Sequence, residues 1–485
     1  MKIFDKTVYF LLGLQYNIMC NCNYIGGKVL FEIDNLLKSI KKVHFIGIGG
    51  SGMCPLAEIL LGEGYDITGS DNNEGDNIDK LRSLGVKITM GQKAENIEGS
   101  EMIVYTAALL QDNPELVAAK QSGIPTFERS KFFGAITRMY NNCVGICGTH
   151  GKTTATSMLT QILITAKVDP TAVIGGKLPL IDSHGRVGKS ETMVCEACEF
   201  VDTFLELSPD VAVILNIDED HLDYFKTVDN LIASFTKFAN LATRLIIANG
   251  DDTKTMKAIN GITDKQIITF GLDDKNDYTA SNIKFNRGAF PQFDVYHKGK
   301  FLGNIKLNVP GEHNVLNALA AIAAAIDAGA EFTYISQALE EFKGAGRRFE
   351  IIGEFNGITI ADDYAHHPAE LKATLNAVMQ MEYNEVWAVF QPFTFSRTSM
   401  LLDDFANVLQ IPDHAVLTEI MGSREVNTYG IKTQDLTDKI PGSVWFNTFE
   451  EVADYVTQNA KKGDLIITLG CGDIYKAAKL MAKKY

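Results

Sequence analysis

The sequence lacks any block of basic residues. Its 485 residues include 45 Lys and Arg against 60 Asp and Glu, which gives a formal net charge of −15 at pH 7. A chain with this charge and no local basic face repels phosphate backbones. We therefore expect no nucleic acid partner.

Regular cysteine spacing is also missing. The eight cysteines are scattered along the chain, and most of them, such as Cys54, Cys143, Cys147 and Cys471, lie in apolar or glycine-rich stretches, as reduced core thiols do. This usage favours a cytoplasmic protein. The C-x-x-C pair in "VCEACEF" has no second pair at zinc-ribbon spacing, so the sequence does not favour a zinc or redox site there.

No apolar run is long enough to cross a bilayer, so we expect no insertion into a membrane. Residues 6–22, "KTVYFLLGLQYNIMCNC", resemble the apolar part of a signal peptide. However, Asp5 lies where basic residues are expected, and no small-residue cleavage site follows. We expect residues 1–40 to be an added helix or to result from a start codon upstream of the true one, with Met19 a candidate start.

The residues that are present describe an ordinary α/β protein. Apolar residues make up 46% of the chain and charged residues 22%, and the 41 glycines suggest many tight turns between strands and helices. A chain this long cannot form one core, so we expect roughly three domains of about 150 residues. Apolar strands followed by a turn and a helix recur throughout, which predicts mostly parallel sheets. We see no internal repeat or low-complexity segment.

The first such unit, "KKVHFIGIGGSGMCPLAEILLGEGYDITGSD", carries the dinucleotide-binding fingerprint. A strand leads into Gly47-x-Gly49-x-x-Gly52, a helix follows, and a second strand ends at Asp71. The glycines let the backbone approach a diphosphate, and the helix N-terminus supplies N–H donors. From this unit alone, a nicotinamide or flavin cofactor is the favoured ligand. The predicted binding residues are Gly47, Gly49, Gly50, Ser51, Gly52, Asp71 and, at the end of a later strand, Thr106.

The second unit opens with "VGICGTHGKTTATSML", which resembles a phosphate-binding loop but has Ile146 where the usual pattern requires glycine. Its working parts are present: glycines that expose amide donors, Lys152 for the β and γ phosphates, and Thr153 with a hydroxyl suited to Mg²⁺. The alternative is a strand-to-helix turn with a chance lysine. The predicted phosphate-binding residues are Gly148, Thr149, His150, Gly151, Lys152, Thr153 and Thr154.

Acidic residues follow two further strands of this unit. Glu196 ends the strand "TMVCE", and "NIDEDHLD" follows the strand "VAVIL" with Asp218, Asp220 and His221. The carboxyl ends of parallel strands meet at one edge of the sheet, where the phosphate loop also lies. Mg²⁺ takes hard oxygen ligands and few protein groups beside phosphate and water. These residues are therefore magnesium ligand candidates, although acidic turns are often only solvated.

Six motifs in order carry a family resemblance that extends from Val43 over nearly the whole remaining chain: "GTHGKTT", "NIDEDHLDYF", "PGEHNVLNALAA", "GRRFE", "DDYAHHP" and "FQP…SRT". Together they resemble the Mur ligases of peptidoglycan synthesis. The resemblance changes the interpretation of the first unit, because in this family the glycine-rich turn holds the diphosphate of a UDP-sugar. Asp71 is then expected near the ribose or uracil, and no nicotinamide is involved.

The resemblance implies an ATP-dependent ligase that joins L-alanine to the carboxylate of UDP-N-acetylmuramate through an acyl phosphate, with ATP and Mg²⁺ as cofactors. The implied domains are a UDP-sugar domain at residues 41–140, a central ATP-binding P-loop domain at 141–343 and an amino-acid-binding, Rossmann-like domain at 344–485, with a hinge near Phe342 to Gly346. Closure of the domains would keep water from the acyl phosphate.

The resemblance also implies residue roles. Lys152 neutralises the transferring phosphoryl group, His366 or His367 contacts phosphate or muramate, and Arg397 pairs with the alanine carboxylate. The implied metal ligands are Thr153 for one ion and Glu196 and His221 for a second ion. The implied adenine and ribose contacts are His313, Asn314 and Asn317 in the central domain and Arg347, Arg348 and Asp362 across the hinge.

Two positions depart from the family pattern. Phe393 stands where alanine-adding members commonly have histidine in "FQPH", which leaves the acceptor open, and "EACEF" replaces the commoner "EADES" while keeping Glu196. The alternatives are a ligase that recycles murein tripeptide, a nicotinamide-dependent oxidoreductase that leaves Lys152 idle, and a nucleotide sensor built on an inactive ligase. The sequence does not predict the oligomeric state.

Overall fold

The computed structural model describes residues 23–25, 28–30, 32–286, 288–423 and 425–484. The expectations for Met19 and the apolar segment at residues 6–22 lie outside these residues. Among the helices described, none has the length and apolar character that a membrane span needs. The described chain opens with an antiparallel pair, β1 (Asn23–Ile25) and β2 (Lys28–Leu30), followed by α2 (Glu32–Leu37).

Helix α2 is anchored to the first domain. Ile33 and Leu37 are buried in its core. The carboxylate of Asp34 accepts a hydrogen bond at 2.9 Å from Nε of Arg138, and both side chains are nearly buried. The last part of the predicted extension is therefore packed into the fold.

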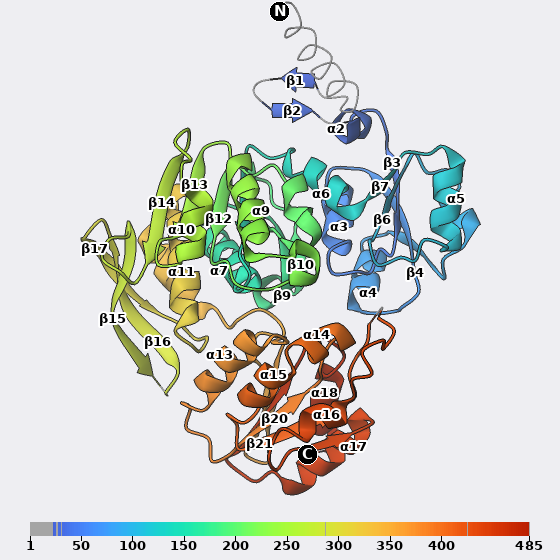
Figure 1. The fold of residues 1–485 in the computed structure, drawn as a ribbon. Coiled ribbons are helices and arrows are strands. Elements are labelled where there is room, and N and C mark those ends of the chain that lie inside the picture. Colours follow the sequence, from blue (N-terminus) through green and yellow to red (C-terminus); the bar gives the residue numbers. More distant parts are fainter. Residues whose placement is uncertain (1–22, 26–27, 31, 287, 424, 485) are drawn as a thin grey trace, which may run out of the picture.

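The first domain, drawn in blue in Figure 1, contains a five-stranded parallel sheet. Its strand order is β5-β4-β3-β6-β7. The strand order reverses beside β3, and ligands bind at such a switch point in open α/β sheets. The glycine-rich turn follows β3 directly, which places it at that point. The elements are β3 (Lys42–Ile46), α3 (Cys54–Gly62), β4 (Asp66–Asp71), α4 (Asp76–Ser83), β5 (Lys87–Met90), η1 (Ala94–Ile97), β6 (Met102–Tyr105), α5 (Pro114–Ser122), β7 (Thr126–Glu128) and α6 (Arg129–Thr137).

The central domain is built on a ten-stranded sheet in the order β10-β9-β11-β8-β12-β13-β14-β15-β16-β17. The strands from β9 to β15 pair in parallel, and β10, β16 and β17 pair antiparallel at the two ends. The elements are β8 (Asn142–Cys147), α7 (Lys152–Thr165), β9 (Thr171–Leu178), η2 (Pro179–Ile181), β10 (Ser183–Arg186), β11 (Thr192–Glu196), η3 (Phe200–Glu206), β12 (Val211–Ile214), α8 (Leu222–Phe225), α9 (Val228–Leu241), β13 (Leu245–Asn249), α10 (Thr253–Ile259), β14 (Gln266–Gly271), β15 (Tyr278–Asn286), β16 (Phe290–His297), β17 (Lys300–Lys306), α11 (His313–Asp327) and α12 (Phe332–Glu341).

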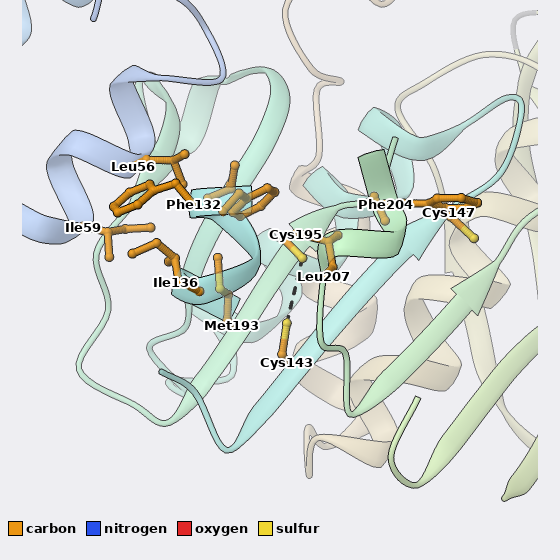
Figure 2. Packing of buried hydrophobic residues seen from close by; sticks show 14 of the residues in the cluster. Leu56, Ile59, Phe132, Ile136, Cys143, Cys147, Met193, Cys195, Phe204 and Leu207 are labelled. Atoms are coloured by element: carbon orange, nitrogen blue, oxygen red, sulfur yellow. Dashed lines mark hydrogen bonds between the residues drawn. The ribbon is translucent and has the colours of Figure 1, made fainter. Parts of the chain in front are cut away.

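The first two domains share one hydrophobic core. Figure 2 shows Ile136 of the first domain beside Met193 of the central sheet, and both belong to one continuous buried cluster with Leu56 and Phe132. The backbones also approach closely, because a Cβ at Gly134 of α6 would lie 2.1 Å from the carbonyl oxygen of Glu206. Only glycine fits such an approach. The boundary predicted near residue 140 therefore separates two sheets that are packed together.

The third domain is a six-stranded sheet in the order β18-β19-β23-β20-β21-β22, parallel except for β18, with a hydrophobic cluster on each face. Three α/β units with mostly parallel sheets confirm the predicted fold class. The elements are β18 (Glu350–Phe355), β19 (Ile358–Asp363), α13 (Pro368–Val378), β20 (Val386–Phe390), α14 (Phe395–Met400), α15 (Leu402–Val408), β21 (His414–Thr418), α16 (Thr433–Thr437), β22 (Val444–Phe446), α17 (Phe449–Asn459), β23 (Leu465–Leu469) and α18 (Tyr475–Lys484).

The linker to this third domain is fixed to the central domain over its first half. Phe342 is fully buried, and the backbone N–H of Gly346 donates to the carbonyl oxygen of Lys177 at 2.6 Å. After this anchor, Arg347 and Phe349 have φ of 59° and 48°, in the left-handed region that non-glycine residues seldom adopt. The change of direction between the domains thus falls just after the predicted hinge at residues 342–346.

Candidate active site

The turn between β8 and α7 is shaped by two glycines and two asparagines. Gly148 has φ of 147° and Gly151, which precedes α7, has φ of 85°. A Cβ at Gly151 would lie 2.3 Å from Oδ1 of Asn317. Asn216 accepts the N–H of His150 at 2.8 Å and donates to its carbonyl oxygen at 3.0 Å. These contacts hold the loop in one shape.

Lys152 begins α7 and turns its ammonium back into this loop. Nζ donates to the carbonyl oxygens of Gly148 at 2.6 Å and Thr149 at 3.0 Å, and to Oε1 of Glu199 at 3.0 Å. Burial of the ammonium favours its neutral form, but Glu199, together with Cys198 and Glu196, outweighs burial and raises the pKa of Lys152 above its usual range. The lysine is therefore a fixed positive charge in the loop.

Thr153 and Glu196 face each other beside the loop. The Thr153 hydroxyl donates to Oε2 of Glu196 at 2.8 Å, and the N–H of Gly175 donates to the same oxygen at 2.9 Å. A hydroxyl and a carboxylate are hard oxygen donors of the kind that Mg²⁺ prefers. Over the described part of the chain, no group of three or more His, Cys, Asp and Glu could hold a metal ion by itself. Any ion here would need phosphate or water to complete its ligands.

The third predicted metal ligand, His221, follows another strand of the same sheet. β11, which carries Glu196, and β12, which precedes His221, pair with opposite edges of β8. His221 lies with Nε2 3.7 Å from Oδ2 of Asp220 and its ring 4.8 Å from that of Phe200. Its role as a metal ligand stays a prediction.

A cavity of about 260 Å³ lies between the central and third domains, directly behind the phosphate loop. The buried asparagines are joined by a hydrogen bond from Asn317 to Asn314 at 2.9 Å. Burial, helped by the nearby Arg348 and His150, lowers the pKa of His313 to about 4, so this ring is neutral at pH 7. The predicted nucleotide-binding residues that line this cavity are His150, Gly151, Thr154, His313, Asn314, Asn317 and Arg348.

A larger cavity of about 1210 Å³ lies where all three domains meet. The carboxylate of Asp71 accepts the N–H of Gly49 at 2.9 Å, and a Cβ at Gly47 would lie 2.7 Å from Cγ2 of Thr106. These contacts keep the glycine-rich turn open to a ligand. Gly52 lies against Arg129. The predicted residues that line this cavity are Gly47, Gly49, Gly50, Ser51, Asp71, Thr106, Thr153, Glu196, Arg347, Arg348 and Asp362.

Arg347 is bound into the third domain. Its Nε donates to Oδ2 of the buried Asp362 at 2.8 Å, and its Nη atoms donate to the carbonyl oxygens of Gly472 at 3.0 Å and Gly470 at 2.6 Å. The guanidinium also lies 4.9 Å from the ring centre of Tyr475. With these contacts Arg347 anchors the linker to the third domain, whereas the neighbouring Arg348 faces both cavities.

The predicted residues of the third domain gather opposite the phosphate loop. His367 is the N-cap residue of α13, with its ring centre 6.1 Å from that of His150. His366 lies with Nδ1 3.3 Å from Oε2 of Glu370, and burial lowers the pKa of both histidines. Nη2 of Arg397 lies 3.8 Å from Oδ1 of Asp220 in the central domain. The two domains thus meet through charged side chains.

His150 connects the two domains electrostatically. Its Nε2 lies 3.6 Å from Oδ2 of Asp218 in the central domain, and its Nδ1 lies 3.6 Å from Oε1 of Glu370 in the third. Burial of the ring alone would lower its pKa, but the two carboxylates outweigh this and raise the pKa of His150 to about 9. The imidazolium is therefore the form that stabilises the contact.

This ion pair makes a pH dependence testable. A histidine whose pKa is higher in the folded protein than in the unfolded chain stabilises the fold. This contribution is complete below the ordinary histidine pKa of about 6.5 and is lost as pH rises through the folded-state pKa. We expect the melting temperature of the protein to exceed that of His150→Gln at pH 6.5, and this difference to disappear as pH rises through about 9. Thermal unfolding of both proteins from pH 6.5 to 10 measures it. A constant difference would contradict the assignment.

Sequence reasoning missed two acidic residues of this site, Glu199 and Glu370. Each stands within a quoted motif or just beyond it: Glu199 follows Glu196 by three residues in "EACEF", and Glu370 follows His366 by four. Spacing of three or four residues next to a predicted ligand is the signal that could have identified them.

Comparison with known proteins identifies the family. Three family models cover the chain: "Mur ligase family, catalytic domain" at residues 42–141, "Mur ligase middle domain" at 146–325 and "Mur ligase, glutamate ligase domain" at 347–472. The chain belongs to the Mur ligase family. Each matched range corresponds to one of the three larger sheets.

The chain is similar over most of its length to alanine-adding ligases from several bacteria. The chain is 43% identical over 454 residues to the UDP-N-acetylmuramate–L-alanine ligase of Caldanaerobacter subterraneus, covering 92% of this chain and 98% of that protein. It is 44% identical over 460 residues to the enzyme of the same name from Clostridium acetobutylicum, covering 94% and 100%. The solved UDP-N-acetylmuramate-alanine ligase of Thermotoga maritima is 29% identical, with a TM-score of 0.79 and coverage of 92% and 99%.

Proposed function

We propose that this chain is an ATP-dependent ligase that joins L-alanine to the carboxylate of UDP-N-acetylmuramate through an acyl phosphate. The observation that carries the proposal is that one loop borders both cavities: Gly151 and Thr154 line the smaller one, and Thr153 between them in the sequence lines the larger one. A nucleotide in the first cavity and a carboxylate in the second would meet at this loop. The names of the relatives give the same two substrates, UDP-N-acetylmuramate and L-alanine.

The two steps assign separate tasks to the chain. A carboxylate oxygen of the muramate attacks the γ-phosphorus, the bond to the bridging oxygen breaks and ADP leaves with that electron pair. The alanine amine then attacks the acyl carbon, a proton is lost from nitrogen and inorganic phosphate leaves. Lys152 supplies a fixed positive charge beside the transferring group, and Arg397 is the candidate partner of the alanine carboxylate.

Magnesium is part of this proposal. Thr153 Oγ1 and a carboxylate oxygen of Glu196 are the protein groups that would hold the ion, and their 2.8 Å separation fits two neighbouring oxygen donors. When bound, Mg²⁺ would neutralise charge on the phosphate oxygens. The glycine-rich turn, with Asp71 fixing Gly49, would receive the diphosphate of the nucleotide sugar.

Phosphate release tests the proposal directly. With ATP, Mg²⁺ and UDP-N-acetylmuramate present, we expect release to depend on L-alanine and to be much lower with glycine, L-serine or murein tripeptide. Omitting the nucleotide sugar is the control and should abolish release. Release with tripeptide alone would instead make the chain a recycling ligase, and would connect this acceptor with Phe393 in place of the usual histidine. No release with any acceptor would contradict the ligase proposal.

A further inference from the structure

The ammonium of Lys152 has no hydrogen left to offer a ligand. Its three N–H bonds point to the carbonyl oxygens of Gly148 and Thr149 and to Glu199. The carboxylate of Glu199 faces the lysine with both oxygens, since Oε2 also lies 2.9 Å from Nζ. The lysine and glutamate side chains are 14% and 2% exposed. A phosphate oxygen can therefore bind Lys152 only by displacing one of these acceptors.

Glu199 is the acceptor that phosphate would displace. The two carbonyl oxygens belong to the loop itself, which Asn216 and Asn317 hold in shape, so they cannot withdraw. Glu199 instead carries the same charge as a phosphate oxygen and competes with it for one cation. A buried carboxylate whose cation is drawn away is left uncompensated, and this loss opposes nucleotide binding.

The backbone after Glu199 takes an unusual course beside the loop. Val201 and Asp202 have φ of 54° and 58°, a conformation that is costly for a β-branched valine. The carboxylate of Asp202 accepts hydrogen bonds from the hydroxyls of Tyr224 and Ser234, and Phe204 stacks on Phe238 with ring centres 4.8 Å apart. Strain of this kind persists only where surrounding contacts enforce it. Here those contacts set the course of the backbone that follows Glu199, whose carboxylate meets Lys152 in the empty loop.

We propose that Glu199 is a positioning residue that acts as an internal substitute for phosphate. Its carboxylate holds the Lys152 ammonium in position when the loop is empty, and it yields the ammonium to the phosphates of the nucleotide. The inference rests on the proposed function only in taking ATP and ADP as the ligands. In this role Glu199 lowers the affinity for nucleotide and stabilises the empty loop.

Glu199→Gln tests this exchange, because the amide keeps the shape and loses the charge. We expect the dissociation constants of ATP and ADP to fall by at least about threefold, the melting temperature without nucleotide to fall, and the rise in melting temperature on adding nucleotide to become larger. Damage to folding alone would weaken nucleotide binding, so tighter binding separates the two explanations.

Two further variants complete the test. Glu206→Gln removes a charge from the exposed end of the same η3 segment and should leave nucleotide affinity unchanged. Glu199→Asp keeps the charge and should bind nucleotide as the wild type does, more weakly than Glu199→Gln. If the wild type binds nucleotide and Glu199→Gln binds it equally or less well, the substitute role is wrong and the ligase proposal stands. If the wild type binds neither ATP nor ADP, both proposals fail.

Discussion

Replacing Lys152 by methionine is expected to lower the rate of ligation by about 10² to 10³-fold. The side chain keeps its length and loses the positive charge that would lie beside the transferring phosphoryl group. Initial rates of phosphate release at saturating substrates measure the effect. Lys167→Met is the matched control, because Lys167 is exposed just after the same helix, and it should keep wild-type activity. A rate for Lys152→Met within about threefold of wild type would exclude the phosphate role.

The same substitution leaves Glu199 buried without its cation, so Lys152→Met should also lose stability. Breaking a buried ion pair from one side typically costs about 3–5 kcal/mol. The double variant Lys152→Met/Glu199→Gln removes both charges and should recover most of that stability while ligation stays lost. This outcome would separate the catalytic contribution of Lys152 from its structural one. If the double variant recovers activity together with stability, the whole effect of Lys152→Met is due to folding.

Arg347→Ala is expected to produce the largest loss of stability in the third domain, about 3–5 kcal/mol. The substitution removes three hydrogen bonds at once and leaves the carboxylate of Asp362, which is 1% exposed, without its cation. Burial already raises the pKa of Asp362 in spite of Arg347, so the unpaired carboxylate would be strongly disfavoured. Denaturant unfolding followed by the fluorescence of Trp387 and Trp445 in this domain measures the loss.

The neighbouring arginine offers a control of equal charge. Arg348 faces both cavities and lies 5.1 Å from the ring centre of Tyr364. Arg348→Ala should weaken nucleotide binding and change stability by less than about 1 kcal/mol. If the two substitutions destabilise the protein equally, the distinction between an anchoring and a ligand-facing arginine is incorrect.

The parts of the site that the sequence predicted best are those that depend on local geometry. The turn after β3 and the loop before α7 need glycine at fixed spacings, because Gly47 and Gly151 approach other side chains too closely for a Cβ. A few consecutive residues are therefore enough to predict where these turns lie. The three α/β units followed from the repeated alternation of apolar strands and helices in the same way.

The parts that the sequence could not predict depend on how distant elements meet. Strand order places Glu196 and the segment before His221 on opposite sides of β8, which spacing along the chain does not reveal. Glu370 reaches His150 only because the linker sets the third domain against the loop. Nothing in the sequence indicated that Arg347 would donate hydrogen bonds to Asp362 and to two carbonyl groups. Arg347 lines the larger cavity as well, and its role as a nucleotide contact stays a prediction.

The continuous core between the first two sheets determines which distances in the site can change. Gly47 and Thr153 line the same cavity and belong to domains that share buried side chains. The distance between the glycine-rich turn and the phosphate loop is therefore fixed. The smaller cavity has walls on both sides of the linker. Rotation after Gly346 would thus keep the glycine-rich turn and the phosphate loop together and would move only the third-domain walls of the two cavities. The angle of the third domain is therefore a control on how firmly the nucleotide is enclosed.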